Sequence, residues 1–450
     1  FRPAAPAGEG VTNPGTSEPG RIPPRVLMAV LLAALGVRVL HLLQAGTAPE
    51  FGVPWLDQQF YHDQAAALAS EGEIAFSGFR SLLYPWLVSL VYRVAGPDPV
   101  AVIWVQSVLG CVAAGLCATA AWRLAGSAAA ALAAGFLFAL NPVVPVFECG
   151  LLTAAPSLLV MAVFALALVR ALEPSARPCW LAAVGVTPAL LLHLTPQLAP
   201  VLLAPLLFAR GGAPARPWIV GGFAATLVLL AGLHAGIAGK AFAAGGSSGI
   251  NAWLGNRVGA DGIFPKQPRA VSYQGGYQDP IELLAVEEAR RLTGNAQLSP
   301  DRVSGFWWGQ TFSEIRSSPG RWTALMIRKA WVSLWNAEPP NVLNPGFWKR
   351  HAAPMLAWLP AGWGILLVCS APALWRSARR TRALAVAVGL GLAGLCLFFV
   401  NSRYRLPLVA PMSVLAGAGL VAVRGAFVAK AWKPVVAMAI VILIERGELT

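Results

Sequence analysis

Three polar residues stand at helical spacing in the stretch that follows the first apolar run of the chain. Asp57, Tyr61 and Gln64 lie at i, i+4 and i+7, so they share one face of a helix that begins near Asp57. An Asp at a helix start is often only an N-cap. The alternative is a functional acidic site, because five of the chain's 20 acidic residues cluster here. They are Glu50, Asp57, Asp63, Glu71 and Glu73.

Cationic residues near the expected outer ends of apolar segments form a second group of candidates, for binding an anion. They are Arg80, Arg257, Lys329, Arg403 and Arg405. Arg and Lys at such positions commonly extend to the lipid headgroups, which is the simpler interpretation for each. The alternating R-Y-R of 403–405, just outside an apolar span, is less easily explained in that way, so Arg403 and Arg405 are the preferred candidates.

Other polar residues carry weaker signals. His193 and His234 lie inside apolar runs, where a single His is more often a packed polar residue than a ligand, although an intramembrane ionisable group also suggests function. Asn256 and Asp261 either contact a substrate or form turns. Gly-Asn and Asp-Gly are common turn dipeptides, so turns are the preferred interpretation.

The composition excludes a water-soluble chain. Of the 450 residues, 57% are hydrophobic and 12% are charged, about half the usual charged fraction, and the mean hydropathy is +0.62. Long apolar runs predict transmembrane helices and argue against a cytosolic enzyme, a nucleic-acid-binding protein and a disordered scaffold. The six scattered cysteines form no metal-binding spacing, so no metal site is predicted.

The basic residues predict the topology. Their short stretches between apolar segments, within a net charge of +14, fit a cytoplasmic location. With the N-terminus in the cytoplasm, the segments 47–99 and 240–354 lie outside, and 82–96 and 322–336 lie along the membrane instead of crossing it. Residues 1–24 form a disordered tail, and 25–450 form the membrane domain. The predicted spans are 26–46, 100–122, 128–147, 155–172, 179–195, 197–210, 218–239, 355–374, 383–400, 406–423 and 433–444.

Several motifs, in this order along the chain, resemble a known family. Asp57, Tyr61 and Ala65 form D-x-x-x-Y-x-x-x-A, and a helix that starts S-L-L-Y-P at 81–85 and ends V-A-G at 94–96 follows. Later come GGSSGINAWLGNRVGADGIFP at 245–265 and NSRYRLPLVAP at 401–411. Together they are similar to the polyprenyl-phosphate-sugar glycosyltransferases of the GT-C fold. The nearest group is family 39, which includes protein O-mannosyltransferases and lipid A aminoarabinose transferases.

The resemblance implies a catalytic carboxylate in the first outer loop, at Asp57. Many members have Asp-Glu here, whereas this chain has Gln58, so a second carboxylate is absent or is supplied by Asp63. In the next outer loop members commonly have L-L-x-E. This chain has Ala154 at that Glu, and the nearest acid is Glu148.

The resemblance also implies a reaction. A carboxylate would deprotonate the acceptor hydroxyl while the transfer inverts the anomeric carbon, and cations would hold the leaving phosphate. The catalytic candidates are Asp57 and Asp63. The candidates for the donor phosphate are Arg403, Arg405 and Arg80. The candidates for further substrate contacts are Tyr61, Glu148, Asn256 and Asp261.

The sequence therefore predicts an all-α polytopic membrane protein with a GT-C-like fold, of about 11 transmembrane helices plus juxtamembrane helices in two large extracytoplasmic loops. We expect it in a bacterial inner membrane, with an outward-facing site that transfers a sugar from a polyprenyl phosphate to a glycan, lipid or protein hydroxyl. Nucleic acid is not an expected partner. A divalent cation and protein partners stay open.

Two alternatives remain. A catalytically silent membrane subunit, which acts as a structural partner in a larger complex, is motivated by the departures at Gln58 and Ala154. A transporter is less favoured, because the two halves show no repeat and the spans show no buried charge pairs.

Overall fold

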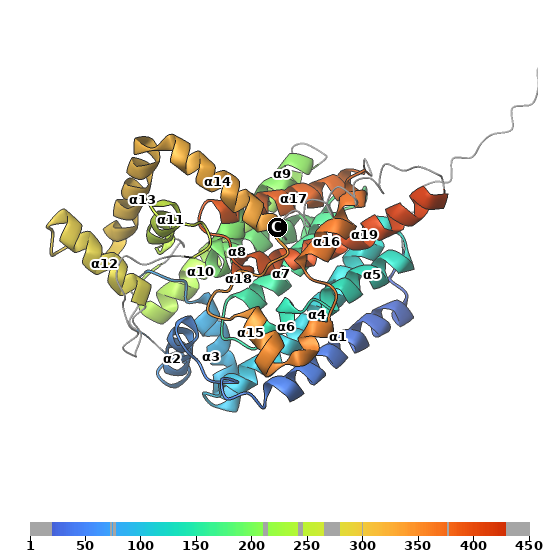
Figure 1. The fold of residues 1–450 in the computed structure, drawn as a ribbon, viewed down its shortest axis with the longest axis horizontal. Coiled ribbons are helices and arrows are strands. Elements are labelled where there is room, and N and C mark those ends of the chain that lie inside the picture. Colours follow the sequence, from blue (N-terminus) through green and yellow to red (C-terminus); the bar gives the residue numbers. More distant parts are fainter. Residues whose placement is uncertain are drawn as a thin grey trace, which may run out of the picture.

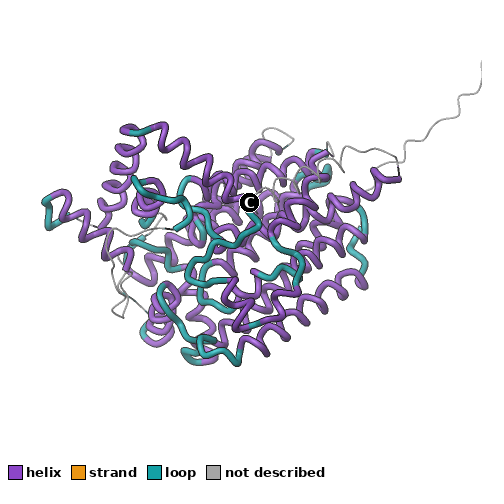
Figure 2. Tube along the Cα trace, in the orientation of Figure 1, coloured by secondary structure: helices purple, strands orange, loops and turns teal. Residues whose placement is uncertain are grey.

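The structure is a computed structural model that describes residues 20–72, 74, 78–209, 215–241, 246–264, 280–298, 300–375 and 378–428. Within these ranges the chain is helical, and its only β-structure is one isolated bridge in a loop (Figure 2). The all-α prediction is confirmed. The predicted tail up to residue 19 and the predicted span 433–444 lie outside the described residues.

Within the described part of the chain, six segments are long and apolar enough to cross a membrane, so the protein is polytopic. They are α1 (Pro24–Ala45), α4 (Pro99–Ala125), α7 (Ala154–Ala171), α10 (Ala215–Ala238), Pro354–Leu374 and Ser402–Ala426. The last comprises α18 (Ser402–Arg405), η5 (Leu406–Leu408) and most of α19 (Val409–Val428). Shorter apolar helices are α5 (Ala128–Ala139), α8 (Pro178–Leu194), η1 (Pro196–Leu202) and α9 (Leu203–Phe208), and α17 (Arg379–Cys396) starts in a basic cluster.

Two predicted spans are interrupted, and the two interruptions contact each other. The span 128–147 divides into α5 and α6 (Val143–Glu148), and the span 355–374 divides into η3 (Pro354–Trp358), α16 (Trp363–Ser370) and η4 (Ala371–Trp375). Asn141, between α5 and α6, donates a hydrogen bond to the carbonyl of Ala361 at 2.8 Å and accepts one from the Val143 amide. The side chain thus satisfies backbone groups that the helix breaks release, as an apolar surrounding requires.

One end of the bundle gathers residues from several predicted cytoplasmic connections. Glu173, after α7, lies within 3.3–3.7 Å of the guanidinium groups of Arg123, Arg170 and Arg380, which belong to α4, α7 and α17. Arg379 also donates to the carbonyl of Phe208, at the end of α9. The helix ends that the basic pattern assigns to one side of the membrane therefore do lie together.

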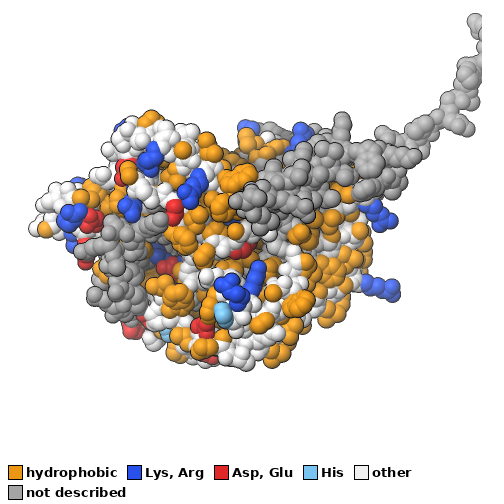
Figure 3. All heavy atoms as spheres, viewed as in Figure 1, with side chains coloured by type: hydrophobic (Ala, Val, Ile, Leu, Met, Phe, Trp, Pro, Cys, Tyr) orange, Lys and Arg blue, Asp and Glu red, His pale blue; other side chains and the backbone are white. Residues whose placement is uncertain are grey.

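The two large connecting segments lie toward the opposite end. The first contributes α2 (Asp57–Ser70) and α3 (Leu83–Ala95), whose 13 residues are fewer than the ~20 that a straight crossing needs. The second contributes α11 (Ser248–Asn256), α12 (Pro280–Thr293), α13 (Pro300–Ser317), α14 (Pro319–Leu334), α15 (Pro345–Phe347) and η2 (Trp348–Ala352). In Figure 1, α11 to α14 project to the left and α14 runs back to the bundle. Charged side chains gather over this projection, and apolar ones dominate the lower right (Figure 3).

The sidedness of the bundle gives a first prediction. Cys179 is exposed at the start of α8, and Asn295 is exposed between α12 and α13. Since short basic connections stay in the cytoplasm, a membrane-impermeant maleimide should label Asn295→Cys on intact cells, in a background that carries Cys179→Ser. Native Cys179 should react only after permeabilisation. The reverse labelling pattern would mean that the bundle is inserted the other way round.

Candidate functional site

Asp57, the first residue of α2, pairs with two arginines from distant parts of the chain. Its Oδ2 accepts a hydrogen bond from Arg403 at 2.5 Å, and its Oδ1 accepts one from Arg80 at 3.4 Å. Leu56 occupies the N-cap position of α2, so the N-cap interpretation of Asp57 does not hold. The predicted helix start is confirmed, and the side chain of Asp57 faces cations.

The two arginines control the charge of Asp57. Burial alone would raise the pKa of its carboxyl, but the charges of Arg80 and Arg403, with a hydrogen bond from each, bring the pKa well below its usual range. Asp57 is therefore ionised throughout the physiological range. A carboxylate in this state is a weak base as long as both arginines face it.

Two cavities meet at this ion-paired group. One is about 570 Å³, which is typical of small-ligand sites, and Asp57 lines it. The other is about 90 Å³ and extends past Tyr61 toward His193 in the bundle. Four residues line both cavities: Arg80, Asn251, Arg403 and Tyr404. A ligand that bridged the two cavities would contact both arginines.

The wall of the larger cavity holds an unusual backbone. Among the described residues, Leu56 (φ 49°) and Val342 (φ 56°) are the two non-glycine residues with a positive φ, and both line this cavity. Such a conformation is a marked outlier for a β-branched residue. Residues held in sparsely populated conformations concentrate at functional sites. Leu56 directly precedes Asp57, and Asn341, beside Val342, accepts a hydrogen bond from Arg403 at 3.4 Å.

The segment around Arg80 is anchored by two histidines in the bundle. The amide of Leu82 donates to Nε2 of His234 at 2.9 Å, and Ser81 Oγ lies 2.9 Å from Nδ1 of His193. Arg80 itself donates to the Tyr61 hydroxyl at 3.3 Å. Tyr61 therefore lies beside Arg80 and lines the smaller cavity, and its contact with a substrate stays a prediction. The two histidines are packed polar residues whose contacts fix the turn after Arg80.

Arg403 and Arg405 have different surroundings. Arg403 is 3% exposed and lines both cavities. Arg405 is 1% exposed and lines neither; it donates to the carbonyls of Trp335 (2.6 Å) and Ala337 (2.7 Å) and to the carboxylate of Glu338 (2.9 Å). The guanidinium of Arg405 is thus engaged by the segment after α14, and Arg403 is the arginine of this motif that faces the cavities.

Two other acidic candidates lie away from the site. Asp63, on another face of α2, accepts a hydrogen bond from Gln59 at 2.7 Å and lines neither of the two cavities. Glu148 is fully buried, pairs with Arg38 of α1 at 2.7 Å, and also lines neither cavity. Asp63 instead lines a separate cavity of about 850 Å³ beside Arg93, so neither acid joins Asp57 at the two cavities. The Arg38–Glu148 pair corrects the expectation that the spans hold no buried charge pair.

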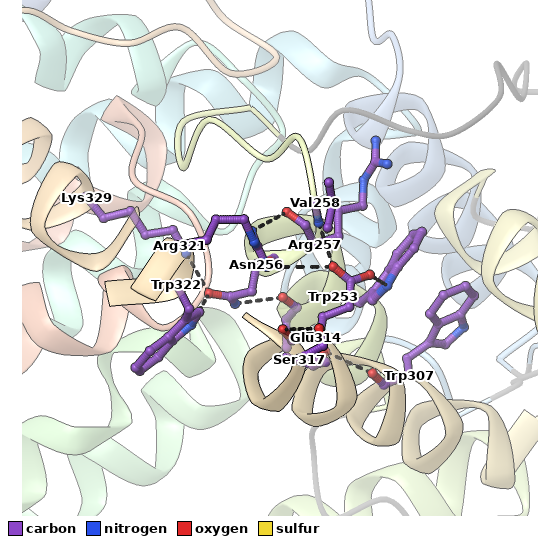
Figure 4. Close-up of polar contacts among 12 residues, drawn as sticks. Trp253, Asn256, Arg257, Val258, Trp307, Glu314, Ser317, Arg321, Trp322 and Lys329 are labelled. Carbon is purple, nitrogen blue, oxygen red and sulfur yellow. Dashed lines mark hydrogen bonds and ion pairs between the residues drawn. The ribbon is translucent and has the colours of Figure 1, made fainter. Parts of the chain in front are cut away.

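Asp261 forms a turn, as the preferred interpretation expects, whereas Asn256 is the last residue of helix α11 and not part of a turn. Asn256 is the centre of the network in Figure 4: its Oδ1 accepts from Trp322 (3.1 Å) and Lys329 (3.0 Å), and its Nδ2 donates to the Leu397 carbonyl (2.8 Å). Asp261 accepts from the amides of two following residues. Neither residue lines the two cavities.

Gln58, where the resembling family has a glutamate, also has a structural role. It is 4% exposed, and its Oε1 accepts a hydrogen bond from the Leu151 amide at 3.1 Å. The bond joins α2 to the connection before α7. A backbone amide is a donor that either an amide or a carboxylate oxygen satisfies. The difference at this position therefore preserves the local contact while it removes a charge beside Asp57.

Sequence reasoning missed three residues of the site, namely Asn251, Asn341 and Tyr404. Tyr404 stands inside the R-Y-R motif, and Arg403 lies 5.4 Å from the centre of its ring. Asn341 follows two prolines in a loop that has no periodic pattern. The described residues hold no group of three or more His, Cys, Asp or Glu placed to bind a metal ion.

Of the comparisons with known proteins, only the comparison with solved structures finds similar chains. No family model and no curated protein matches the chain. ArnT from Cupriavidus metallidurans, solved with undecaprenyl phosphate, is 15% identical over 88% of this chain and 77% of that chain, with a TM-score of 0.37. The Archaeoglobus fulgidus oligosaccharyltransferase in its apo form is 13% identical over 93% of this chain, with a TM-score of 0.45. This chain covers 54% of that one. Similarity at this level assigns the chain to no family.

The Asn256 network gives a second prediction. Lys329 is completely buried and donates to Asn256 Oδ1 (3.0 Å) and to the carbonyls of Cys396 (3.0 Å) and Phe398 (2.5 Å), shortly before Arg403. Lys329→Met removes this donor from the carbonyls of Cys396 and Phe398, and each buried acceptor left unsatisfied costs about 1–3 kcal/mol, whereas Asn256 Oδ1 keeps its bond from Trp322. We expect a lower melting temperature in a thermal unfolding assay. Lys349→Met, at a half-buried lysine, is the control and should melt as the wild type does.

Proposed function

We propose that this protein is a membrane glycosyltransferase of the GT-C type that transfers a sugar from a polyprenyl-phosphate donor to an extracytoplasmic hydroxyl. The observation that carries the proposal is the position of Asp57, between Arg80 and Arg403, where two cavities meet beside an apolar bundle. The order of motifs that resemble such enzymes supports the same assignment.

The two arginines suit a phosphodiester. Guanidinium groups bind phosphate through charge-assisted hydrogen bonds in a fixed planar geometry. Nε of Arg403 is buried and has no acceptor within the described part of the chain, so it is able to serve an incoming anion. The phosphate of the donor would then take over Arg80 and Arg403 as partners and release Asp57 from them.

The larger cavity suits a ligand that has both a charged and an apolar part. Its lining includes the two arginines and Asp57 together with aromatic and aliphatic side chains. These include Trp55, Leu56, Phe264, Val342 and Phe399. A polyprenyl phosphate combines an anionic group with a long hydrocarbon chain. The hydrocarbon chain would extend into the lipid beside the bundle.

The proposed step follows from these positions. The acceptor oxygen attacks the anomeric carbon while the bond from that carbon to the phosphate oxygen breaks, and the configuration inverts. Asp57 accepts the proton of the acceptor hydroxyl. The electron pair of the broken bond stays on the phosphate, whose added negative charge Arg80 and Arg403 stabilise.

A catalytically silent subunit is the second candidate, and the contacts of Gln58 and Glu148 favour it. Both side chains are committed to structural bonds, so no second carboxylate joins Asp57 among the described residues that line the two cavities. Lack of transfer by the wild type, with a panel of polyprenyl-phosphate sugars that it demonstrably binds, would support this second candidate.

Replacement of Asp57 tests the proposed reaction. Asn keeps the shape and a hydrogen-bond acceptor but takes no proton at neutral pH, so Asp57→Asn should lower the rate of transfer by about 10²–10⁴-fold. Binding of the donor should persist, because Arg80 and Arg403 lose the carboxylate that competes with the phosphate. Single-turnover transfer and donor binding are the measurements.

Asp63→Asn is the matched control for this replacement. It makes the same chemical change on the same helix, away from both cavities, and should leave transfer within about twofold of the wild type, as surface substitutions usually do. Full transfer activity of Asp57→Asn would remove Asp57 from the reaction.

The pH dependence tests the exchange of partners. In the free enzyme the charges of the two arginines keep the pKa of Asp57 well below its usual range. A bound phosphodiester neutralises part of that charge, so the pKa of Asp57 should rise in the complex. Because kcat/KM reports the free enzyme and kcat reports the complex, the acid limb of kcat should lie at higher pH than that of kcat/KM. Coincident limbs would contradict the exchange.

A further inference from the structure

A third cavity lies at the other end of the bundle from Asp57. It measures about 420 Å³ and is bounded by the start of α1, the ends of α4 and α7, and the start of α8. Three arginines line it: Arg21, Arg123 and Arg170. The rest of its wall is mainly apolar and includes Leu27, Leu166 and two tryptophans.

The polar part of this cavity carries an excess of positive charge. Glu173 is the carboxylate that contacts Arg123 and Arg170, and it also contacts Arg380. Within the described part of the chain, three arginines contact this one carboxylate, and Arg21, which is exposed, adds a further positive charge to the lining of the cavity. Nε of Arg170 is buried and has no acceptor within the described residues. The charges thus favour an anion.

The apolar part has the chemistry of a lipid site. Trp122 donates its indole N–H to the carbonyl of Gly20 at 2.9 Å, and Arg170 lies 5.1 Å from the centre of the Trp180 ring. Tryptophan concentrates at the boundary between headgroups and hydrocarbon. Leu27 and Leu166, on helices that cross the membrane, continue the wall. A single ligand with an anionic head and acyl chains matches both parts.

We propose that this cavity binds an anionic phospholipid, with its phosphodiester at Arg21, Arg123 and Arg170 and its acyl chains against Leu27 and Leu166. The site is separate from the one at Asp57, and the proposal does not depend on the transferase activity. It would fix the cytoplasmic ends of α1, α4, α7 and α8 relative to one another and to the membrane surface.

Native mass spectrometry tests this proposal. The full chain is released from detergent micelles that contain either phosphatidylglycerol or phosphatidylcholine, and the lipid that stays bound is measured. The wild type should retain phosphatidylglycerol in preference to phosphatidylcholine. Arg21→Gln and Arg170→Gln should each lower the apparent affinity for phosphatidylglycerol about fivefold, the usual effect of one basic residue near anionic lipid. Thr119→Phe, which fills the cavity and keeps its charges, should also reduce retention.

Arg382→Gln is the matched control, because Arg382 is exposed at the same end and does not line the cavity. It should retain the lipid as the wild type does. Equal retention of the two lipids, or equal losses in Arg382→Gln and Arg170→Gln, would overturn the proposal. Displacement of the lipid by millimolar glycerol phosphate would also overturn it, because the cavity would then bind the phosphate group alone.

Discussion

An ionised carboxylate between two guanidinium groups is the interaction on which the site depends. It joins Asp57 to Arg403, 346 positions later, and to Arg80 in the turn before α3. Each of the three charged residues is held by a different part of the fold. Asp57 is the first residue of α2, and histidines of α8 and α10 bind the residues that follow Arg80. Ser402, which precedes Arg403, donates hydrogen bonds from its amide and its hydroxyl to the carbonyl of Pro339. The bundle and both large connecting segments therefore contribute to one ion-paired group.

Local spacing predicted the parts of the site that depend on a single helix. The face shared by Asp57 and Tyr61 follows from a helical period and is present in the structure, and both residues contact Arg80. The alternation of R-Y-R suggested that Arg403 and Arg405 act together, but the structure separates them. Residues 402–405 form a helical turn, in which i and i+2 are separated by about 200° around the axis, so Arg403 and Arg405 face opposite ways.

Long-range contacts decided the residues that sequence reasoning misplaced. Glu148 had no visible partner in the sequence, because Arg38 is 110 positions away on another helix. A buried charge in an apolar region requires a partner, and the fold makes room for this pair at Gly110. A Cβ at Gly110 would lie 1.9 Å from Glu148 Oε1. The acid nearest to the expected second catalytic position is thus used for packing α1 against α6, which leaves Asp57 as the carboxylate at the junction of the two cavities.

The charge of this group explains why one carboxylate and two arginines suit the proposed reaction. With a phosphodiester bound, Asp57 and the phosphate carry two negative charges against the two positive charges of Arg80 and Arg403. During transfer the phosphate gains one negative charge as its bond to the sugar breaks, and Asp57 loses one as it accepts the proton. The total is the same before and after the step.

A site of low dielectric constant stabilises such a reaction without rearrangement of its own groups, because charge moves over a short distance between partners that are already in place. A second carboxylate in the same place would add a negative charge that neither arginine could balance, so glutamine at position 58 is compatible with a working transferase.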